Sequence, residues 1–182
     1  MKKLFALLMV LALVFSMAAC GGQTDTGGGG DESADEVITI GVSMPTQSLQ
    51  RWNEDGTYLK QKLEAAGYAV DLQYGGDNDI PTQVAQIENM ITQGCKVLVI
   101  AAIDGSSLTE VLKPAKEAGI PVIAYDRLIM NSDAVSYYAT FDNFLVGVMQ
   151  GEYVKEALDL DNAEGPFNIE LFTGDPADNN AT

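Results

Sequence analysis

The stretch KVLVIAA, residues 96–102, decides the fold of this chain. It is a continuous apolar run, which is typical of a parallel strand that is covered on both of its faces. Gly94 ends the segment before the run, and Asp104-Gly105 supplies turn chemistry after it. We therefore predict a buried parallel strand here, and with it a sheet that carries helices on both sides.

Strand-like and helix-like segments alternate on both sides of this run. Further strands are predicted at residues 37–43, 69–74, 121–125, 136–140 and 167–172. Helices are predicted over residues 53–66, from Asp79, from Ser106 or Ser107, and over residues 144–158. The βαβ rhythm predicts an α/β fold with a doubly wound parallel sheet.

Three features of the predicted helices can be checked directly. Asp79 is expected to cap its helix, with Pro81 in the first turn. Pro114 lies inside the next helical pattern, where it should kink or split the helix. Asp142 or Asn143 is expected to cap the last helix.

Charge and composition exclude several classes of protein. The 182 residues carry a formal charge of −16, which becomes −18 once Lys2 and Lys3 are removed (−16 minus 2). Such a field repels phosphate backbones, so no nucleic-acid partner is expected. The chain has no histidine and no CxxC motif, which leaves no zinc site and no Ser-His-Asp or Cys-His catalytic set.

The first twenty residues are typical of an export signal. Residues 1–3 are basic, and residues 4–19 form an apolar run of 16 (19 minus 3), shorter than the ~20 that span a bilayer. The small residues before Cys20 resemble the lipobox of bacterial lipoproteins, which implies a lipid anchor on Cys20 outside the cytoplasm. An ordinary signal followed by an incidental cysteine is the alternative.

The residues that follow Cys20 support the anchored alternative. Residues 21–35 are rich in Gly, Ser, Thr and Asp and have no apolar periodicity, as in a flexible tether. We therefore expect a signal peptide over residues 1–19 and a tether over residues 20–36. Lipidation of Cys20 leaves Cys95 without a disulfide partner, so Cys95 is expected to be a small buried hydrophobe.

Two charged and aromatic pairs follow predicted strands at the edge where α/β sheets bind ligands. Arg51-Trp52 comes after the first strand and Asp126-Arg127 after the fourth. An indole can stack on a sugar ring, while carboxylate and guanidinium can together bind neighbouring hydroxyls. The alternatives are that Trp52 staples the next helix to the core, and that Asp126 and Arg127 form a surface ion pair.

Other strand-end motifs carry less weight. Neither GxGxxG nor GxxxxGK is present, which argues against dinucleotide and P-loop nucleotide binding. Asp104 is interpreted as a turn residue. Asp77, Asp79 and Glu88 only faintly resemble a calcium loop, because Pro81 and Thr82 stand where a ligand and a glycine are needed. No metal or other cofactor is expected.

The whole succession of motifs resembles one family. MPTQSLQRW, GGDNDIPTQVAQIENMITQG, KVLVIAAIDGSSL, IPVIAYDRLI, SYYATFDN and IELFTGDPADNNA occur in this order between residues 37 and 181. Together they resemble the periplasmic sugar-binding proteins of the xylose-binding and multiple-monosaccharide-binding type. The resemblance implies the type I periplasmic binding fold, in which two α/β lobes flank a cleft.

The resemblance also implies which residues contact the sugar. They are Arg51 and Trp52, Asp126 and Arg127, and the DNN segment of Asp178, Asn179 and Asn180. Family members are roughly twice as long, and the stacking aromatic of their second lobe has no counterpart here. We therefore expect an N-terminal lobe over residues 37–140, the start of a second lobe over residues 141–182, and weak binding by this chain.

The implied function is capture of an aldopentose or aldohexose for an ABC permease, by a protein that is monomeric at full length. A sugar sensor that presents its ligand to a receptor would have the same fold and site, so the sequence does not separate the two functions. An exported carbohydrate-active enzyme is a third possibility. Asp104 and Asp126 are the only acids directly after parallel strands, and the lack of histidine argues against a tuned base there.

Overall fold

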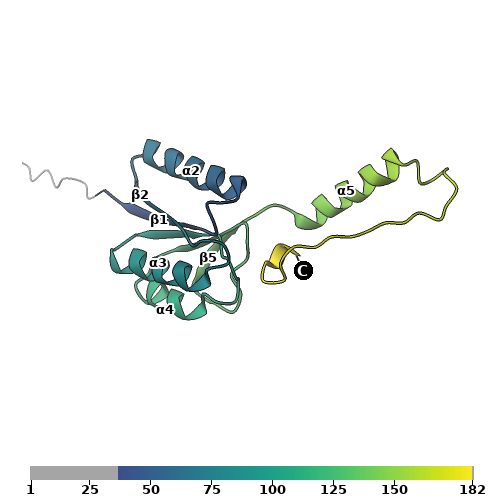
Figure 1. Cartoon of the computed structure of the whole chain (residues 1–182). Helices are drawn as coiled ribbons and strands as arrows, with labels where there is room; N and C mark the ends of the chain where they lie inside the picture. Colours follow the sequence, from purple (N-terminus) through teal and green to yellow (C-terminus); the bar gives the residue numbers. More distant parts are fainter. Residues whose placement is uncertain (1–36, 182) are drawn as a thin grey trace, which may run out of the picture. The chain divides into compact units, whose positions relative to one another are not determined.

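A five-stranded parallel sheet forms the body of the described chain (Figure 1). The structure is a computed structural model that describes residues 37–181, all within a unit that runs from Glu36 to Thr182. The strand order is β2-β1-β3-β4-β5, and every neighbouring pair is parallel. The strands are β1 (Thr39–Met44), β2 (Ala69–Tyr74), β3 (Val97–Ile100), β4 (Val122–Tyr125) and β5 (Val135–Ala139). The predicted signal peptide, Cys20 and the tether lie outside the described residues.

Helices cover both faces of this sheet, as predicted. Figure 1 shows α2 (Gln50–Ala65) on one side of the strands and α3 (Ile80–Thr92) and α4 (Thr109–Glu117) on the other. Leu59 and Leu63 of α2 pack against one core cluster, while α3 and α4 supply the second. The prediction of a doubly wound α/β sheet is confirmed.

Strand β3 explains why the run from Lys96 onward is apolar without interruption. Leu98 and Ile100 belong to the cluster beneath α3 and α4, whereas Val99 and Ala101 belong to the cluster beneath α2. Successive side chains of a strand point to opposite faces, and here both faces are covered by helices. Every position of the strand therefore lies in an apolar environment.

Two of the predicted helix caps are confirmed. The carboxylate of Asp79 accepts from the backbone N–H of Thr82, with Pro81 in the first turn of α3. Asp142 accepts from the N–H of Leu145 and so caps α5 (Asn143–Ala157). Each cap satisfies one of the free donors at a helix start.

The start of α4 differs from the prediction. Ser106 and Ser107 do not open the helix, which begins at Thr109 with Leu108 as the N-cap residue. The hydroxyl and the backbone N–H of Ser106 instead donate to Asp104 of the preceding turn. Pro114 lies inside α4, which remains a single helix, so the expected split is absent.

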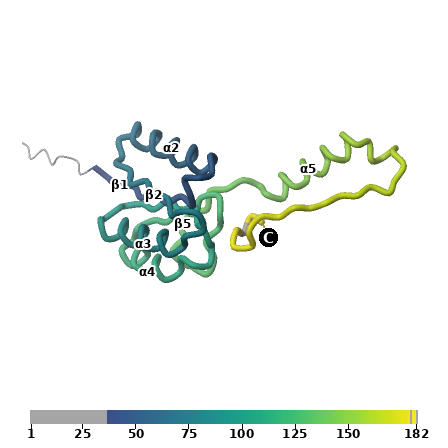
Figure 2. The backbone as a smooth tube through the Cα atoms, viewed as in Figure 1, coloured from purple at the N-terminus to yellow at the C-terminus, as the bar shows by residue number. Residues whose placement is uncertain are grey.

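The prediction of a sixth strand over residues 167–172 is wrong. Its backbone has no strand conformation, and Figure 2 follows it as an irregular stretch after α5. Leu171 and Phe172 are 91 % and 89 % exposed, and α5 has no buried residue. The apolar alternation suits a strand, but no neighbouring strand among the described residues supplies the hydrogen bonds that a strand requires.

No helix between residues 37 and 181 is both long enough and apolar enough to cross a bilayer.

The described core predicts how two apolar truncations will differ. Leu98→Ala removes a fully buried side chain and should lower the free energy of unfolding by about 2–5 kcal/mol. Phe144→Ala on α5 removes a ring that is 82 % exposed, and should change it by no more than ~0.5 kcal/mol. Urea unfolding of the two variants and the parent measures both values. A comparable loss in Phe144→Ala would contradict the exposure of α5.

Candidate functional site

The predicted strand-end residues meet at one edge of the sheet. Asp126 follows β4 directly, and the Nη2 atom of Arg51 lies 2.9 Å from its Oδ1 atom. Arg51 and Trp52 belong to the first turn of α2, which begins at Gln50, although the sequence places the helix start at residue 53. The carboxyl ends of parallel strands share one edge, so residues 75 positions apart form an ion pair there.

Asp126 holds a backbone conformation that few residues adopt. Its φ is 62°, in the left-handed region that aspartate and asparagine tolerate better than other non-glycine residues. Its N–H donates to the carbonyl of Ala139 at 2.7 Å, so the backbone stays joined to the end of β5. The side chain is only 3 % exposed, and its carboxylate faces Arg51 as a buried acceptor.

Two of the three guanidinium nitrogens of Arg127 contact oxygen atoms of other residues. Nη1 donates to the carbonyl of Ala102 at 3.0 Å, and Nη2 lies 2.9 Å from Oδ2 of Asp178. The Nε atom is buried and has no hydrogen-bond partner among the described residues. A buried donor without a partner is costly, so an acceptor placed beside this N–H would be favourable.

Both guanidinium groups lie close to the ring of Trp52. The Cζ atoms of Arg51 and Arg127 are 4.4 Å and 5.1 Å from the ring centroid, distances at which cations are attracted to an indole face. The residue is 3 % exposed and packs with Val42 and Met44 in the core. This burial favours the alternative that Trp52 staples α2 to the sheet. The residue also lines a hollow of 370 Å³, together with Arg127.

The DNN segment at the end of the described chain reaches the same edge. Besides the contact of Asp178 with Arg127, Nδ2 of Asn180 lies 3.3 Å from the carbonyl and 3.4 Å from Oδ2 of Asp126. Asn143 of α5 donates to Oδ1 of Asn180 at 3.0 Å. The side chain of Asn179 lies outside the described part of the chain. Six of the seven predicted site residues are thus gathered at one place.

Asp55 and Tyr125 belong to this cluster but were missed by the sequence analysis. Asp55 lies one helical turn after Arg51, 3.5 Å from its Nε atom, and accepts from the hydroxyl of Tyr125 at 3.2 Å. The i, i+4 spacing identifies the Arg51–Asp55 pair only if the helix is taken to begin before Arg51. Tyr125, the last residue of β4, was interpreted only as a part of its strand.

The guanidinium of Arg51 and the phenol of Tyr125 both have raised pKa values. Burial works to lower the pKa of Arg51, but the hydrogen bond and charge of Asp126, with the charge of Asp55, outweigh it and raise the pKa. Burial, followed by the charge and hydrogen bond of Asp55, raises the pKa of Tyr125. The cluster therefore presents the cation of Arg51 beside the acceptor oxygens of Asp126, while the hydroxyl of Tyr125 donates to Asp55.

The remaining acidic motifs do not take part in this cluster. Hydrogen bonds from Ser106 lower the pKa of Asp104, which agrees with a turn role and makes this carboxylate a weaker base. Asp77 accepts from the hydroxyls of Thr46 and Ser48. Across residues 37–181, no three acidic or Cys side chains gather in a way suited to a metal ion. Cys95 is 1 % exposed, and burial raises the pKa of its thiol.

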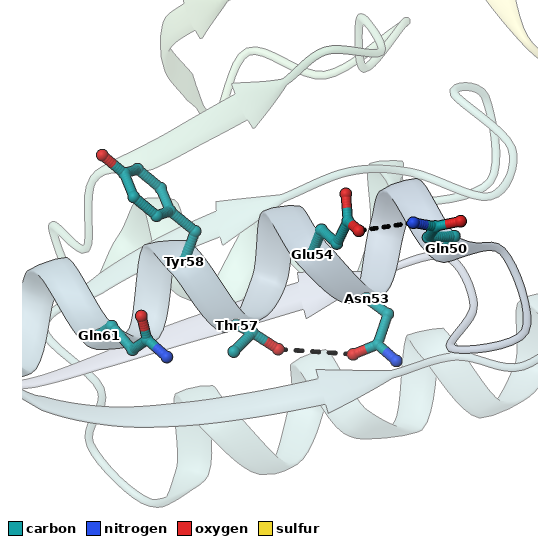
Figure 3. A pocket seen from close by; sticks show the side chains of 6 residues that line it. All are labelled: Gln50, Asn53, Glu54, Thr57, Tyr58 and Gln61. Atoms are coloured by element: carbon teal, nitrogen blue, oxygen red, sulfur yellow. Dashed lines mark hydrogen bonds between the residues drawn. The ribbon is translucent and has the colours of Figure 1, made fainter.

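A larger hollow lies along α2. It measures 450 Å³ and is lined only by residues of α2. Figure 3 shows these side chains along the helix, where Gln50 donates a hydrogen bond to Glu54 and Thr57 donates one to Asn53. It contains none of the predicted site residues, and its polar groups come from a single helix. The candidate site is therefore the cluster at the strand ends.

Residues 40–182 match a family model described as a periplasmic binding protein domain. The multiple sugar-binding periplasmic receptor ChvE of Rhizobium radiobacter is 60 % identical over 143 residues, which are 79 % of this chain and 40 % of that protein. The D-xylose-binding periplasmic protein of Escherichia coli K12 is 39 % identical over 144 residues, 79 % of this chain and 41 % of that protein.

Solved structures agree with these relatives. An ABC transporter solute-binding protein from Clostridium phytofermentans with bound β-D-glucose is 67 % identical, with a TM-score of 0.75 over 79 % of this chain and 44 % of that one. A carbohydrate transporter solute-binding protein from Chloroflexus aurantiacus, in complex with D-glucose, is 36 % identical, with a TM-score of 0.69 over 80 % and 42 %. The chain thus spans less than half the length of each of these four proteins.

The geometry of Asp126 predicts a graded response to substitution. Asp126→Ala removes the ion pair with Arg51. It also places alanine at φ 62°, a left-handed conformation that alanine adopts less readily than aspartate. It should therefore lower the free energy of unfolding by about 1–3 kcal/mol. Asp126→Asn tolerates this backbone and keeps an acceptor, so its loss should be smaller. Urea unfolding compares the two, with Asp133→Ala, an exposed partner of Lys116, as the control. Equal losses for Ala and Asn would contradict a role for the backbone conformation.

Proposed function

Since this chain belongs to the periplasmic binding protein family, we propose that its strand-end cluster binds a monosaccharide for an ABC-type importer. The observation that carries the proposal is the joining of Arg51 to Asp126 at 2.9 Å, beside Arg127 and Trp52. This arrangement concentrates donors and acceptors at the edge where α/β sheets bind ligands. The relatives named above bind sugars and are periplasmic, so we place this chain outside the cytoplasm as well.

The pattern of free hydrogen-bonding capacity fits a polyol. Oδ1 of Asp126 accepts from Arg51, while Oδ2 has only the 3.4 Å contact with Asn180. Arg127 has a free Nε donor, and Arg51 is half exposed. One hydroxyl can donate to Asp126 while a neighbouring hydroxyl accepts from a guanidinium, which is the pattern that a sugar ring with adjacent hydroxyls presents.

Recognition in this proposal consists of exchange of hydrogen bonds. Sugar hydroxyls replace water on the guanidinium and carboxylate groups, and no bond of the sugar is broken. Trp52 contributes an apolar wall to the 370 Å³ hollow, within the range of about 300–1,000 Å³ that ligand sites occupy. The relatives named above are binding proteins and a receptor, and the lowered pKa of Asp104 makes it a poor general base, so turnover is not proposed.

Asp178, Asn179 and Asn180 are proposed to complete the site from the facing side. Asp178 already contacts Arg127, and Asn180 already contacts Asp126, so the segment reaches the same groups that we assign to the sugar. We propose a boundary near residue 140, with residues 37–140 as one lobe and residues 141–182 as the start of another. A monosaccharide would then lie between elements of both, and closure around it would be signalled to the permease.

A sensory role is the second candidate. One relative is named as a sugar-binding receptor, and a binding site of this kind serves a sensor and an importer equally well. In that case the sugar-bound form contacts a receptor instead of a permease. The site residues and the sugar titration below are the same for both candidates.

The sugar proposal predicts a change in the fluorescence of Trp52, the only tryptophan of the chain. Titration of the full chain with D-glucose, D-xylose, D-galactose or L-arabinose should give a saturable change, with a dissociation constant of about a millimolar. Asp126→Ala removes charged hydrogen bonds and should weaken binding at least about tenfold. Asp133→Ala, at the opposite edge of the sheet, is the matched control.

Two results would contradict this proposal. One is a folded chain whose fluorescence is unchanged at high concentrations of all four sugars. The other is equal affinity in the parent and in Asp126→Ala, which would mean that the sugar binds elsewhere.

We further propose that Cys20 carries a lipid and that residues 1–19 are removed on export. The apolar run, the small residues before Cys20 and the Gly-rich stretch after it support this. The anchor would keep the binding unit near its membrane partner on a tether formed by residues 20–36.

The lipid proposal is tested in a bacterial host that processes lipoproteins. The parent should incorporate labelled palmitate and appear in the membrane fraction, whereas Cys20→Ser should lose both properties. Cys95→Ala is the matched control, since Cys95 is buried and should leave labelling unchanged. Labelling that persists in Cys20→Ser would overturn the assignment of the anchor.

A further inference from the structure

Asp77 fastens the loop that leads into α2. Its Oδ1 atom accepts from the hydroxyl of Thr46 at 2.5 Å and from that of Ser48 at 2.6 Å. These two residues lie in the loop between β1 and α2, about 30 positions away in sequence. The N–H of Ser48 also donates to Thr46 Oγ1 at 3.1 Å. One carboxylate oxygen thus gathers the hydroxyls of a neighbouring loop.

Asp77 is itself held on both sides. Before it, the N–H of Gly75 donates to the carbonyl of Met44 at 2.9 Å, which joins the loop after β2 to the end of β1. A Cβ at Gly75 would lie 2.7 Å from Ile103 Cδ1, so the backbone here is tightly packed. After it, Asp79 caps α3. The backbone on both sides of Asp77 is therefore held in place, and the loop between β1 and α2 is hydrogen-bonded to its side chain.

The start of α2 is not held by a capping side chain of its own. Its N-cap residue, Leu49, makes no side-chain cap hydrogen bond, although free N–H groups at a helix start normally find such a partner. The loop that Asp77 fastens ends where α2 begins, and the first turn of α2 carries Arg51 and Trp52. The position of these two site residues is thus tied to a carboxylate on another loop.

We propose that Asp77 is a positioning residue for the sugar site: by binding Thr46 and Ser48 it fixes the start of α2, and with it Arg51 and Trp52. The role in sugar binding rests on the proposed function, whereas the effect on Trp52 does not. Asp77 and Trp52 also line the same 370 Å³ hollow, so loosening the loop alters the wall of the site. Pre-organised groups bind more tightly because less freedom is lost on binding.

The test uses the full chain and two readouts on each variant. Acrylamide quenching of Trp52, without sugar, reports how often the ring is uncovered. In Asp77→Ala the Stern–Volmer constant should rise about twofold, because a loop held by fewer bonds opens more often. The dissociation constant for D-glucose should rise about fivefold, because the site is less pre-organised. Asp133→Ala, which loses an equal charge at the opposite sheet edge, should change neither.

Two further variants separate positioning from other roles. Asp77→Asn keeps an oxygen that can accept from the hydroxyls, so it should restore most of the shielding of Trp52, whereas a purely electrostatic role would leave it as impaired as Asp77→Ala. The double variant Thr46→Val with Ser48→Ala removes the donors instead and should reproduce Asp77→Ala. It also decides the matter if Asp77→Ala does not fold.

The two proposals fail in different ways. Unchanged quenching of Trp52 in Asp77→Ala and in the double variant would overturn the positioning role, even if sugar binding fell. A parent that binds none of the sugars would refute the proposed function, while the quenching data would still decide whether Asp77 holds the loop.

Discussion

The ion pair between Arg51 and Asp126 is the interaction on which the candidate site depends. The Nη2 atom of Arg51 lies 2.9 Å from Oδ1 of Asp126, and the pair joins the first turn of α2 to the end of β4. The hydrogen bond from Tyr125 to Asp55 links the same two elements. Side chains also hold the backbone of Asp126, since its carbonyl accepts from the hydroxyls of Tyr138 and Thr140 at 3.1 Å each. Several hydrogen bonds therefore hold Asp126 where it faces Arg51, and, against the effect of burial, the hydrogen bond and charge of Asp126 raise the pKa of Arg51. Pre-organised charge of this kind suits reversible recognition of hydroxyls.

The sequence predicts the sheet well because its signals are local. The apolar run that includes β3 is continuous since Val99 and Leu98 point to opposite covered faces, and Asp79 caps α3 as its position before Pro81 suggests. Arg51 and Asp126 were expected near one another because parallel strands end at a common edge. In contrast, residues 167–172 have the alternation of a strand and yet no described strand to pair with, so propensity alone misleads there.

The details missed by the sequence analysis are long-range ones. The first turn of α2 was placed in a loop because no capping residue marks its start, and the partners that hold this start lie on another loop. Asp55 was overlooked as a consequence, since its relation to Arg51 appears only when both lie on one helix. The burial of Trp52 and the approach of two guanidinium groups to its ring are likewise tertiary properties. Such pairings depend on which loops meet, and sequence spacing carries no record of that.

The left-handed backbone of Asp126 restricts how this site can evolve. At φ 62°, glycine, asparagine and aspartate are the residues tolerated best, and among these only aspartate carries the charge that Arg51 faces. A lineage that adapts to a different ligand can therefore hardly vary position 126 itself. Changes in specificity are therefore expected at neighbouring positions, such as Asp178 or the loop before α2, so that one acid held by its backbone can serve descendants with different preferences.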